Sequence, residues 1–139
     1  MAGFADLAER LAELEDIPSR IAREVSDGIT EEIRQQFDAG TDPYGAPWTP
    51  LLPSTVRRKR GDRRVLRRTD ALSSQTVARP TSGSGIEITS LPYGGVHQVG
   101  DGSRMAARPI LPDGAELPES WQDIIETASE KAFKKAMRR

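Results

Sequence analysis

Cysteine is absent from this 139-residue sequence, and histidine occurs once, at His97. The absence of thiols excludes disulfides and thiolate metal sites, so the ligands of a metal ion other than His97 would all be carboxylates or carbonyls. The chain also lacks an apolar run near the roughly 20 residues that a membrane helix requires. Its first residues, MAGFADLAERLAELED, do not follow the basic-then-apolar order of a secretory signal. We therefore expect a soluble protein made in the cytoplasm, with no membrane partner.

The motifs that usually mark an enzyme are missing as well. There is no GxSxG nucleophile motif, no GxxxxGK(S/T) phosphate loop and no GxGxxG dinucleotide signature. Asp101 follows His97 by four residues, but a single pair of this kind is weak support for a site. A Ser–His–Asp triad stays open, because its members need not be close in sequence. We expect no enzymatic activity, no metal or other cofactor and no small-molecule substrate, and we keep a small hydrolase that uses His97 as an alternative.

Charge is nearly balanced over the whole chain, with a formal net charge of −1, but it is unevenly distributed. Residues 1–56 carry eleven acids and four bases, a balance of −7. Residues 57–108 carry eleven bases and four acids, a balance of +7. Two opposite blocks can pair within one subunit or between neighbouring subunits. We therefore expect the protein to assemble.

A long apolar stripe begins the chain. Its mean spacing of about 3.7 residues is close to the helical repeat of 3.6, and its members are Phe4, Leu7, Leu11, Leu14, Ile17, Ile21, Val25, Ile29, Ile33 and Phe37. Gly40 is a plausible C-terminal stop. Pro18 and Gly28 disturb the pattern, so we expect two helices or one helix kinked at Pro18. A continuous helix over residues 4–38 would span about 52 Å, against a radius of gyration of about 14 Å for a compact chain of this length. Either the helix folds back or other subunits cover it.

The rest of the chain predicts an α+β fold in a single domain, 1–139. A helical arm, 1–38, precedes a loop-rich β core, 39–117, and a C-terminal helix, 118–139, with Pro118 in its first turn. Within the core, the stretch GTDPYGAPWTPLLPST is an ordered loop that places Trp48 in the core, and Ser54 or Thr55 caps a short helix. ALSSQTVARP, TSGSG and IEITSL predict a strand, a turn and a second strand, and ARPIL a further edge strand.

The basic loop 56–69, VRRKRGDRRVLRRT, carries seven arginines and one lysine against one acid, Asp62. The planar guanidinium of arginine suits paired hydrogen bonds to carboxylates as well as to phosphates. The segment has no aromatic residue for base stacking, and no recognition-helix or zinc-finger pattern accompanies it. Three interpretations stay open: a solvated loop, a contact with an acidic protein surface, and a DNA-binding module that uses residues 57–68. The candidate contact residues are Arg57, Arg58, Lys59, Arg60, Arg63, Arg64, Arg67 and Arg68.

Four motifs follow one another: DPYGAPWTPLLPSTVRRKR after Phe37, then VLRRTDAL, then YGGVHQVG, then ARPIL. In this order the chain resembles the phage virion morphogenesis, or tail completion, family, whose members share patterns near F…DPxGxxWxPLxxxT, LxxTGxL, YAxxHQxG and xARPFLG. Asp70 stands where TGxL has glycine, Gly94 or Gly95 where alanine is common, and ILP replaces FLG. The residues that carry the motifs are Phe37, Pro43, Gly45, Trp48, Pro50, Leu51, Tyr93, His97, Gln98, Gly100, Arg108 and Pro109.

The resemblance implies a non-enzymatic virion component that acts in tail completion at the head–tail junction, or neck, of a tailed phage. It implies a ring of copies, expected to be a hexamer because the tail is sixfold, next to other neck, connector or tail-tube proteins. The motif residues would form the structural and assembly core. The basic loop would touch genomic DNA only without sequence preference, if it faced the channel. Opposite charge blocks suit such a ring, in which unlike surfaces of adjacent copies meet.

Overall fold

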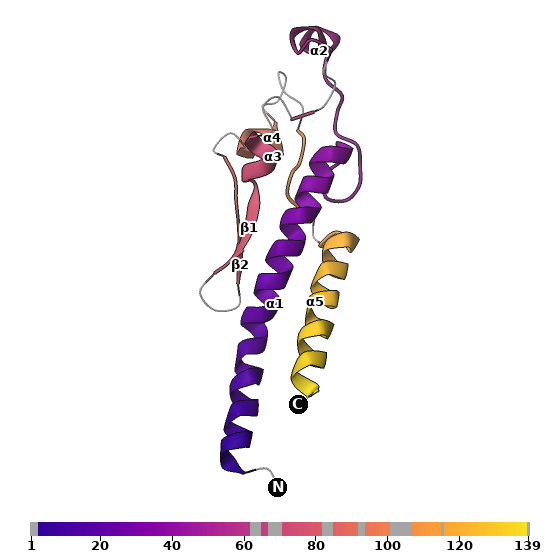
Figure 1. Ribbon diagram of the computed structural model, residues 1–139. Helices are drawn as coiled ribbons and strands as arrows, with labels where there is room; N and C mark the ends of the chain where they lie inside the picture. The colour runs from indigo at the N-terminus through magenta and orange to yellow at the C-terminus, as the bar shows by residue number, and fades with distance from the viewer. Residues whose placement is uncertain are drawn as a thin grey trace.

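The α+β class is confirmed by a computed structural model that describes residues 3–61, 65–66, 71–81, 85–91, 94–100, 107–114 and 116–138 (Figure 1). A long N-terminal helix, a two-stranded antiparallel hairpin and a C-terminal helix are its main parts. The elements, in chain order, are α1 (Phe4–Ala39), α2 (Pro53–Arg58), α3 (Ala71–Gln75), β1 (Val77–Pro80), β2 (Ile86–Thr89), α4 (Gly94–Val99) and α5 (Glu119–Met137).

Helix α1 is the central element, and it packs against α5 on one side and β1 on the other (Figure 1). Its 36 residues run through Pro18, so of the two alternatives the single long helix is confirmed and the pair of separate helices is wrong. Proline removes one intrahelical hydrogen bond, and Pro18 is exposed, where water can satisfy the freed carbonyl. The predicted stop at Gly40 is confirmed: this glycine adopts φ 71°, and its N–H donates to the Gln36 carbonyl at 2.8 Å.

The core forms along the C-terminal half of α1. Four residues spaced by four positions, Val25, Ile29, Ile33 and Phe37, are at most 5% exposed. The other buried hydrophobic residues that pack with them are Trp48, Leu72, Ala78, Ile110, Trp121 and Ala128. These come from the loop after α1, from α3, β1 and α5, and from residue 110, so α1 supplies the surface on which segments from distant parts of the chain assemble. Trp48 lies in the core, as its apolar surroundings in the sequence predicted.

The predicted hairpin is confirmed, although its first strand is shorter than expected. Val77 pairs with Thr89 and Pro80 with Ile86 in an antiparallel register. Residues 71–75, expected to be strand, form helix α3, because the following Thr76 donates both its N–H and its hydroxyl to the Leu72 carbonyl. These bonds close a helical turn and leave only Val77–Pro80 for the sheet.

Thr30 joins the hairpin to α1. Its hydroxyl accepts from the Ala78 N–H at 2.9 Å and lies 3.3 Å from the Ala78 carbonyl, to which it can donate. Both backbone groups of Ala78 therefore face α1 rather than solvent. An unpaired strand edge invites pairing with another chain, and at this position a helix side chain occupies it.

Three local expectations differ from the structure. Helix α2 has Leu52 at its N-cap and Pro53 in its first turn, so neither Ser54 nor Thr55 is the cap. Proline suits that position because its missing N–H would have no intrahelical partner. Pro118 is the N-cap of α5 rather than part of its first turn. Residues 107–111 form no strand, and the reason lies in the contacts of Gln98 described below.

Gly28 explains how closely α1 and α5 approach. A β-carbon added at this position would lie 2.7 Å from Cγ2 of Ile124, a side chain of α5. That methyl group sits on a β-branched side chain with a restricted χ1 angle, so it cannot move aside easily. Gly28 therefore does more than weaken the helix, because its lack of a side chain lets the two helices meet.

We predict that Gly28→Ala lowers the free energy of unfolding by about 1 kcal/mol, because overpacking costs about 1–3 kcal/mol and alanine recovers roughly 1 kcal/mol of helix propensity. In an Ile124→Ala background the same change should instead stabilise the protein by up to about 1 kcal/mol. Urea unfolding of the four proteins in this double-mutant cycle measures both values. Equal effects in the two backgrounds would show that Ile124 is not the obstacle.

Candidate functional site

Several motif residues meet at the C-terminal end of α1. The rings of Phe37 and Trp48 pack edge to face, with centroids 5.4 Å apart and planes at 70°. The indole Nε1 of Trp48 donates to the Pro109 carbonyl at 2.8 Å, and its backbone N–H donates to the Gly40 carbonyl at 2.8 Å. The loop after α1 is therefore folded back on the helix and tied to a segment about sixty residues later in the chain.

Gln98, on α4, uses both ends of its amide on that same segment. Its Oε1 accepts from the backbone N–H groups of Ile110 and Leu111, each at 2.8 Å, and its Nε2 donates to the Leu111 carbonyl at 2.8 Å. These are hydrogen bonds that a neighbouring strand would otherwise make. The stretch ARPIL is held by a side chain, and for this reason it does not form the predicted edge strand.

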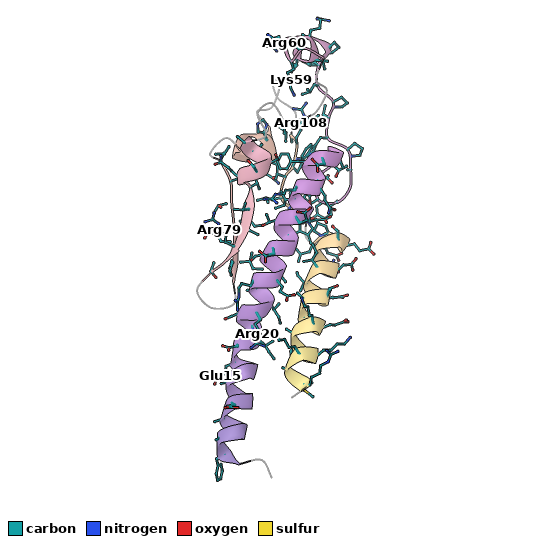
Figure 2. All side chains as sticks on the ribbon, in the orientation of Figure 1. Glu15, Arg20, Lys59, Arg60, Arg79 and Arg108 are labelled. Carbon is teal, nitrogen blue, oxygen red and sulfur yellow. The ribbon has the colours of Figure 1, made fainter. Side chains whose placement is uncertain are left out.

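Arg108 ties the proline-rich loop after α1 to the segment 107–111. Its Nε donates to the Thr49 carbonyl at 2.8 Å, and its Nη2 lies 3.3 Å from the Pro50 carbonyl. Its backbone N–H donates to the His97 carbonyl at 2.7 Å. Because the guanidinium bonds to two successive carbonyls, it fixes the position of the loop. Figure 2 shows Arg108 between the core and the α2 end of the molecule.

The remaining motif residues shape the turns around this junction. Gly45 and Gly100 have positive φ angles of 94° and 73°, which favour glycine. Pro43 is buried, Leu51 is half-buried and Pro50 is exposed. Tyr93 lies outside the described residues.

Residue-type patterns alone missed a buried polar side chain that links three segments, Gln36. Its Nε2 donates to the Ile110 carbonyl at 3.2 Å, and its Oε1 accepts from the indole of Trp121 at 3.1 Å. It thereby joins α1, the segment before α5 and α5 itself, and it is only 5% exposed. Its position three residues after Ile33, on the apolar face of the helix, was the available signal.

Tyr44 makes a second link that the sequence did not indicate. Its hydroxyl donates to the Glu116 carbonyl at 2.7 Å and accepts from the Gly114 N–H at 2.9 Å. The carboxylate of Asp42 holds the same loop by accepting from the N–H groups of Tyr44 and Ala46, each at 2.9 Å. The loop after α1 and the segment before α5 are therefore joined by side chains on both sides.

The start of the basic loop, in α2, lies at the far end of the molecule from both termini (Figure 1). Val56 is buried and anchors α2, whereas Arg57, Arg58 and Arg60 are exposed and Lys59 is half-buried. Figure 2 shows Lys59 and Arg60 at this end. The other four candidates, Arg63, Arg64, Arg67 and Arg68, lie outside the described residues. The structure therefore presents at least three guanidinium groups of the loop to solvent at one tip, away from the motif junction.

Within the described ranges, no group of three or more His, Asp or Glu side chains is placed to hold a metal ion. Among the same residues, no helix is long and apolar enough to cross a membrane.

The His97 ring lies beside Arg108, and the pKa of His97 is lowered from its ordinary value of 6.5, first by burial and second by the positive charge of Arg108.

Comparison with protein families decides what kind of protein this is. A model of the phage virion morphogenesis family matches residues 2–130. The chain belongs to the phage virion morphogenesis family. Comparisons with curated proteins and with solved structures found no match. As a member of this family, the protein is virion-associated and has a structural or assembly role in the phage particle.

We predict that Gln98→Ala lowers the free energy of unfolding of this phage protein by about 2 kcal/mol or more, because two N–H groups and a carbonyl lose their partner. Gln98→Glu keeps the acceptor for the two N–H groups but sets its second carboxylate oxygen against the Leu111 carbonyl, which is also an acceptor, so it should be destabilising as well. Chemical denaturation measures both, with the exposed Gln35→Ala on α1 as a control expected to stay within about 0.5 kcal/mol of the original protein. A Gln98→Ala protein as stable as the Gln35→Ala control would show that the Gln98 hydrogen bonds do not stabilise the fold.

The lowered pKa of His97 predicts a pH dependence of stability. Between the lowered pKa and 6.5 the unfolded chain binds more protons than the folded chain, so stability falls as the pH falls through 6.5. The loss is complete once the pH is below the folded-state pKa. His97 is the only histidine, so His97→Gln should flatten the stability profile between about pH 5 and 7. Thermal unfolding at a series of pH values tests this, and an unchanged profile in the variant would show that another group titrates.

Proposed function

We propose that this virion protein completes the tail at the head–tail junction, as a subunit of a homo-oligomeric neck ring. The four motifs at Phe37–Leu111 carry the proposal, because their likeness to tail completion proteins runs in one order along the chain. The family resemblance favours six copies, matching the sixfold tail. In this role the protein works by binding other virion proteins and has no catalytic activity.

The uses of the motif side chains support a non-enzymatic role. Both ends of the Gln98 amide and the guanidinium of Arg108 are engaged by backbone partners at the junction. A catalytic group must present a free functional atom to a substrate. Gln98 and Arg108 instead hold loops in place, which is what a rigid assembly subunit requires.

The exposed tip of α2 supports docking to an acidic protein surface. Arg57 and Arg58 stand in the last turn of α2, with no acidic residue in its first turn. Arginine at a protein contact can form paired hydrogen bonds with carboxylates. The partner would be an adjacent copy or an adjoining neck protein with a complementary acidic patch.

A DNA-binding module that uses residues 57–68 is the second candidate function. The same exposed arginines favour it, because guanidinium groups bind phosphates as readily as carboxylates. In that case binding would be independent of base sequence and would weaken steeply with added salt. A tip that faced the channel of a neck ring would meet the genome in this way.

The double variant Arg57→Glu and Arg58→Glu separates the two functions. For docking to an acidic surface, we expect the yield of joined head–tail particles to drop about tenfold or more, because like charges brought together cost several kcal/mol. The measurement is electron microscopy and infectivity of particles assembled with the variant as the sole copy. Circular dichroism should remain unchanged, since both side chains are exposed.

Arg79→Glu is the matched control, because Arg79 is an exposed arginine on the hairpin, outside the basic loop. It should leave particle joining unchanged. A salt series of duplex DNA binding is run on the same proteins. Normal joining by the double variant, together with loss of its DNA binding, would reject the docking function and favour the DNA-binding one.

A further inference from the structure

The first turns of α1 project beyond the rest of the protein. Ile17 is 4% exposed, whereas every described side chain before it is exposed, and Phe4 reaches 92%. Figure 1 shows the N-terminal end of α1 continuing past the C-terminal end of α5. We refer to residues 4–16 as the projecting turns.

The projecting turns carry the pattern of a helix that packs on a partner. Phe4, Leu7, Leu11 and Leu14 follow one another at intervals of three, four and three residues. These intervals place the four positions on one face, as in the seam of a coiled coil. Apolar residues at this spacing are typical of a helix face that packs on another surface.

The charge of the projecting turns indicates what kind of surface fits them. Residues 4–16 contain five acids and one base, a balance of −4. Two such segments laid side by side would repel each other. The covering surface should therefore be apolar and basic.

The last turns of α5 have these two properties. Phe133 and Met137 are 53% and 79% exposed and lie four positions apart, on one face of the helix. Residues 131–139 contain five bases and no acid, a balance of +5. Beside them, a cleft of about 410 Å³ between α1 and α5 is lined by four cationic side chains, Arg20, Arg23, Lys131 and Lys135, and by two carboxylates, Glu24 and Asp27.

Within one copy, these two surfaces do not cover each other. Phe4, Phe133 and Met137 all remain exposed, although α1 and α5 pack together along their length. The projecting turns begin where α5 ends, and α1 is one continuous helix that does not fold back. A second copy can supply the surface that each of them lacks.

We propose that the projecting turns of one copy pack on the last turns of α5 of a second copy. Unlike surfaces then meet, so the contact repeats from copy to copy and can close into a ring. The inference rests on the self-assembly in the proposed function and names the surfaces that would form it. It leaves the basic tip of α2 available for a different neck partner.

A charge exchange tests the contact. One variant carries Glu9→Lys and Glu15→Lys in the projecting turns, and the other carries Lys134→Glu and Arg138→Glu in α5; all four side chains are exposed. The first variant changes the balance of the projecting turns from −4 to 0, and the second changes the balance of residues 131–139 from +5 to +1. Each variant therefore loses the charge complementarity of the contact, so we expect it to be monomeric at a concentration where the original protein is oligomeric. A mixture of the two variants can still form one original contact, between the unchanged projecting turns (−4) of the second variant and the unchanged end of α5 (+5) of the first, so a mixed dimer should form where neither variant associates alone. Light scattering and sedimentation velocity measure these states.

The apolar part of the contact has its own matched pair of variants. Met137→Asp should abolish self-association, whereas Val99→Asp, at a similarly exposed valine (74%) on α4, should not. Equal association of both with the original protein would overturn the inference. Variants of the charge exchange that still assemble alone would also overturn it, while leaving the ring and the virion role intact.

Measurements on the original protein distinguish a failure of the proposed contact from a failure of the proposed function. If it stays monomeric at all concentrations yet is incorporated into joined particles, the contact between copies is rejected and the virion role remains. If it is monomeric and absent from particles assembled in its presence, the neck-ring function is rejected together with the contact.

Discussion

The buried face of α1 is the constraint on which the rest of the structure depends. Val25, Ile29, Ile33 and Phe37 form a continuous apolar surface, and α5, β1 and the loop after α1 all pack on it. The two strands and the short helices would be too small to bury a core by themselves. The second half of α1 therefore organises the fold, while its first turns extend past the elements that it organises. A single helix thus provides both the core and a projecting surface.

Side-chain amides complete the structure where regular backbone pairing stops. Gln36 and Gln98 satisfy carbonyl and N–H groups of residues 110–111 that no strand or helix pairs. Buried backbone groups without partners are costly, so such side chains are needed wherever an irregular segment crosses a core. This gives the HQ and ARP motifs a physical meaning. They tie α4, the segment 107–111 and the loop after α1 to one another, although these are distant in the chain.

The sequence by itself determined the elements whose signals are local. The apolar period of α1, its stop at Gly40, the strand pair around a Gly/Ser turn and the C-terminal helix each depend on residues within one element. The family followed from four motifs in one order, which also needs no contact information. The break expected at Pro18 does not occur, because water can satisfy the carbonyl that this exposed proline leaves unpaired.

Only the tertiary structure decided the features that join distant parts of the chain. Gln36 bonds with groups 74 and 85 residues away, and Trp48 with one 61 residues away. The irregular course of residues 107–111 differs from its local pattern because Gln98 supplies competing hydrogen bonds. The role of Gly28 also depends on the tertiary structure, because its lack of a side chain matters only where Ile124 of α5 packs against it. A residue's own neighbours set its conformational preference, but the free energy of its final contacts belongs to partners that folding brings from elsewhere in the chain.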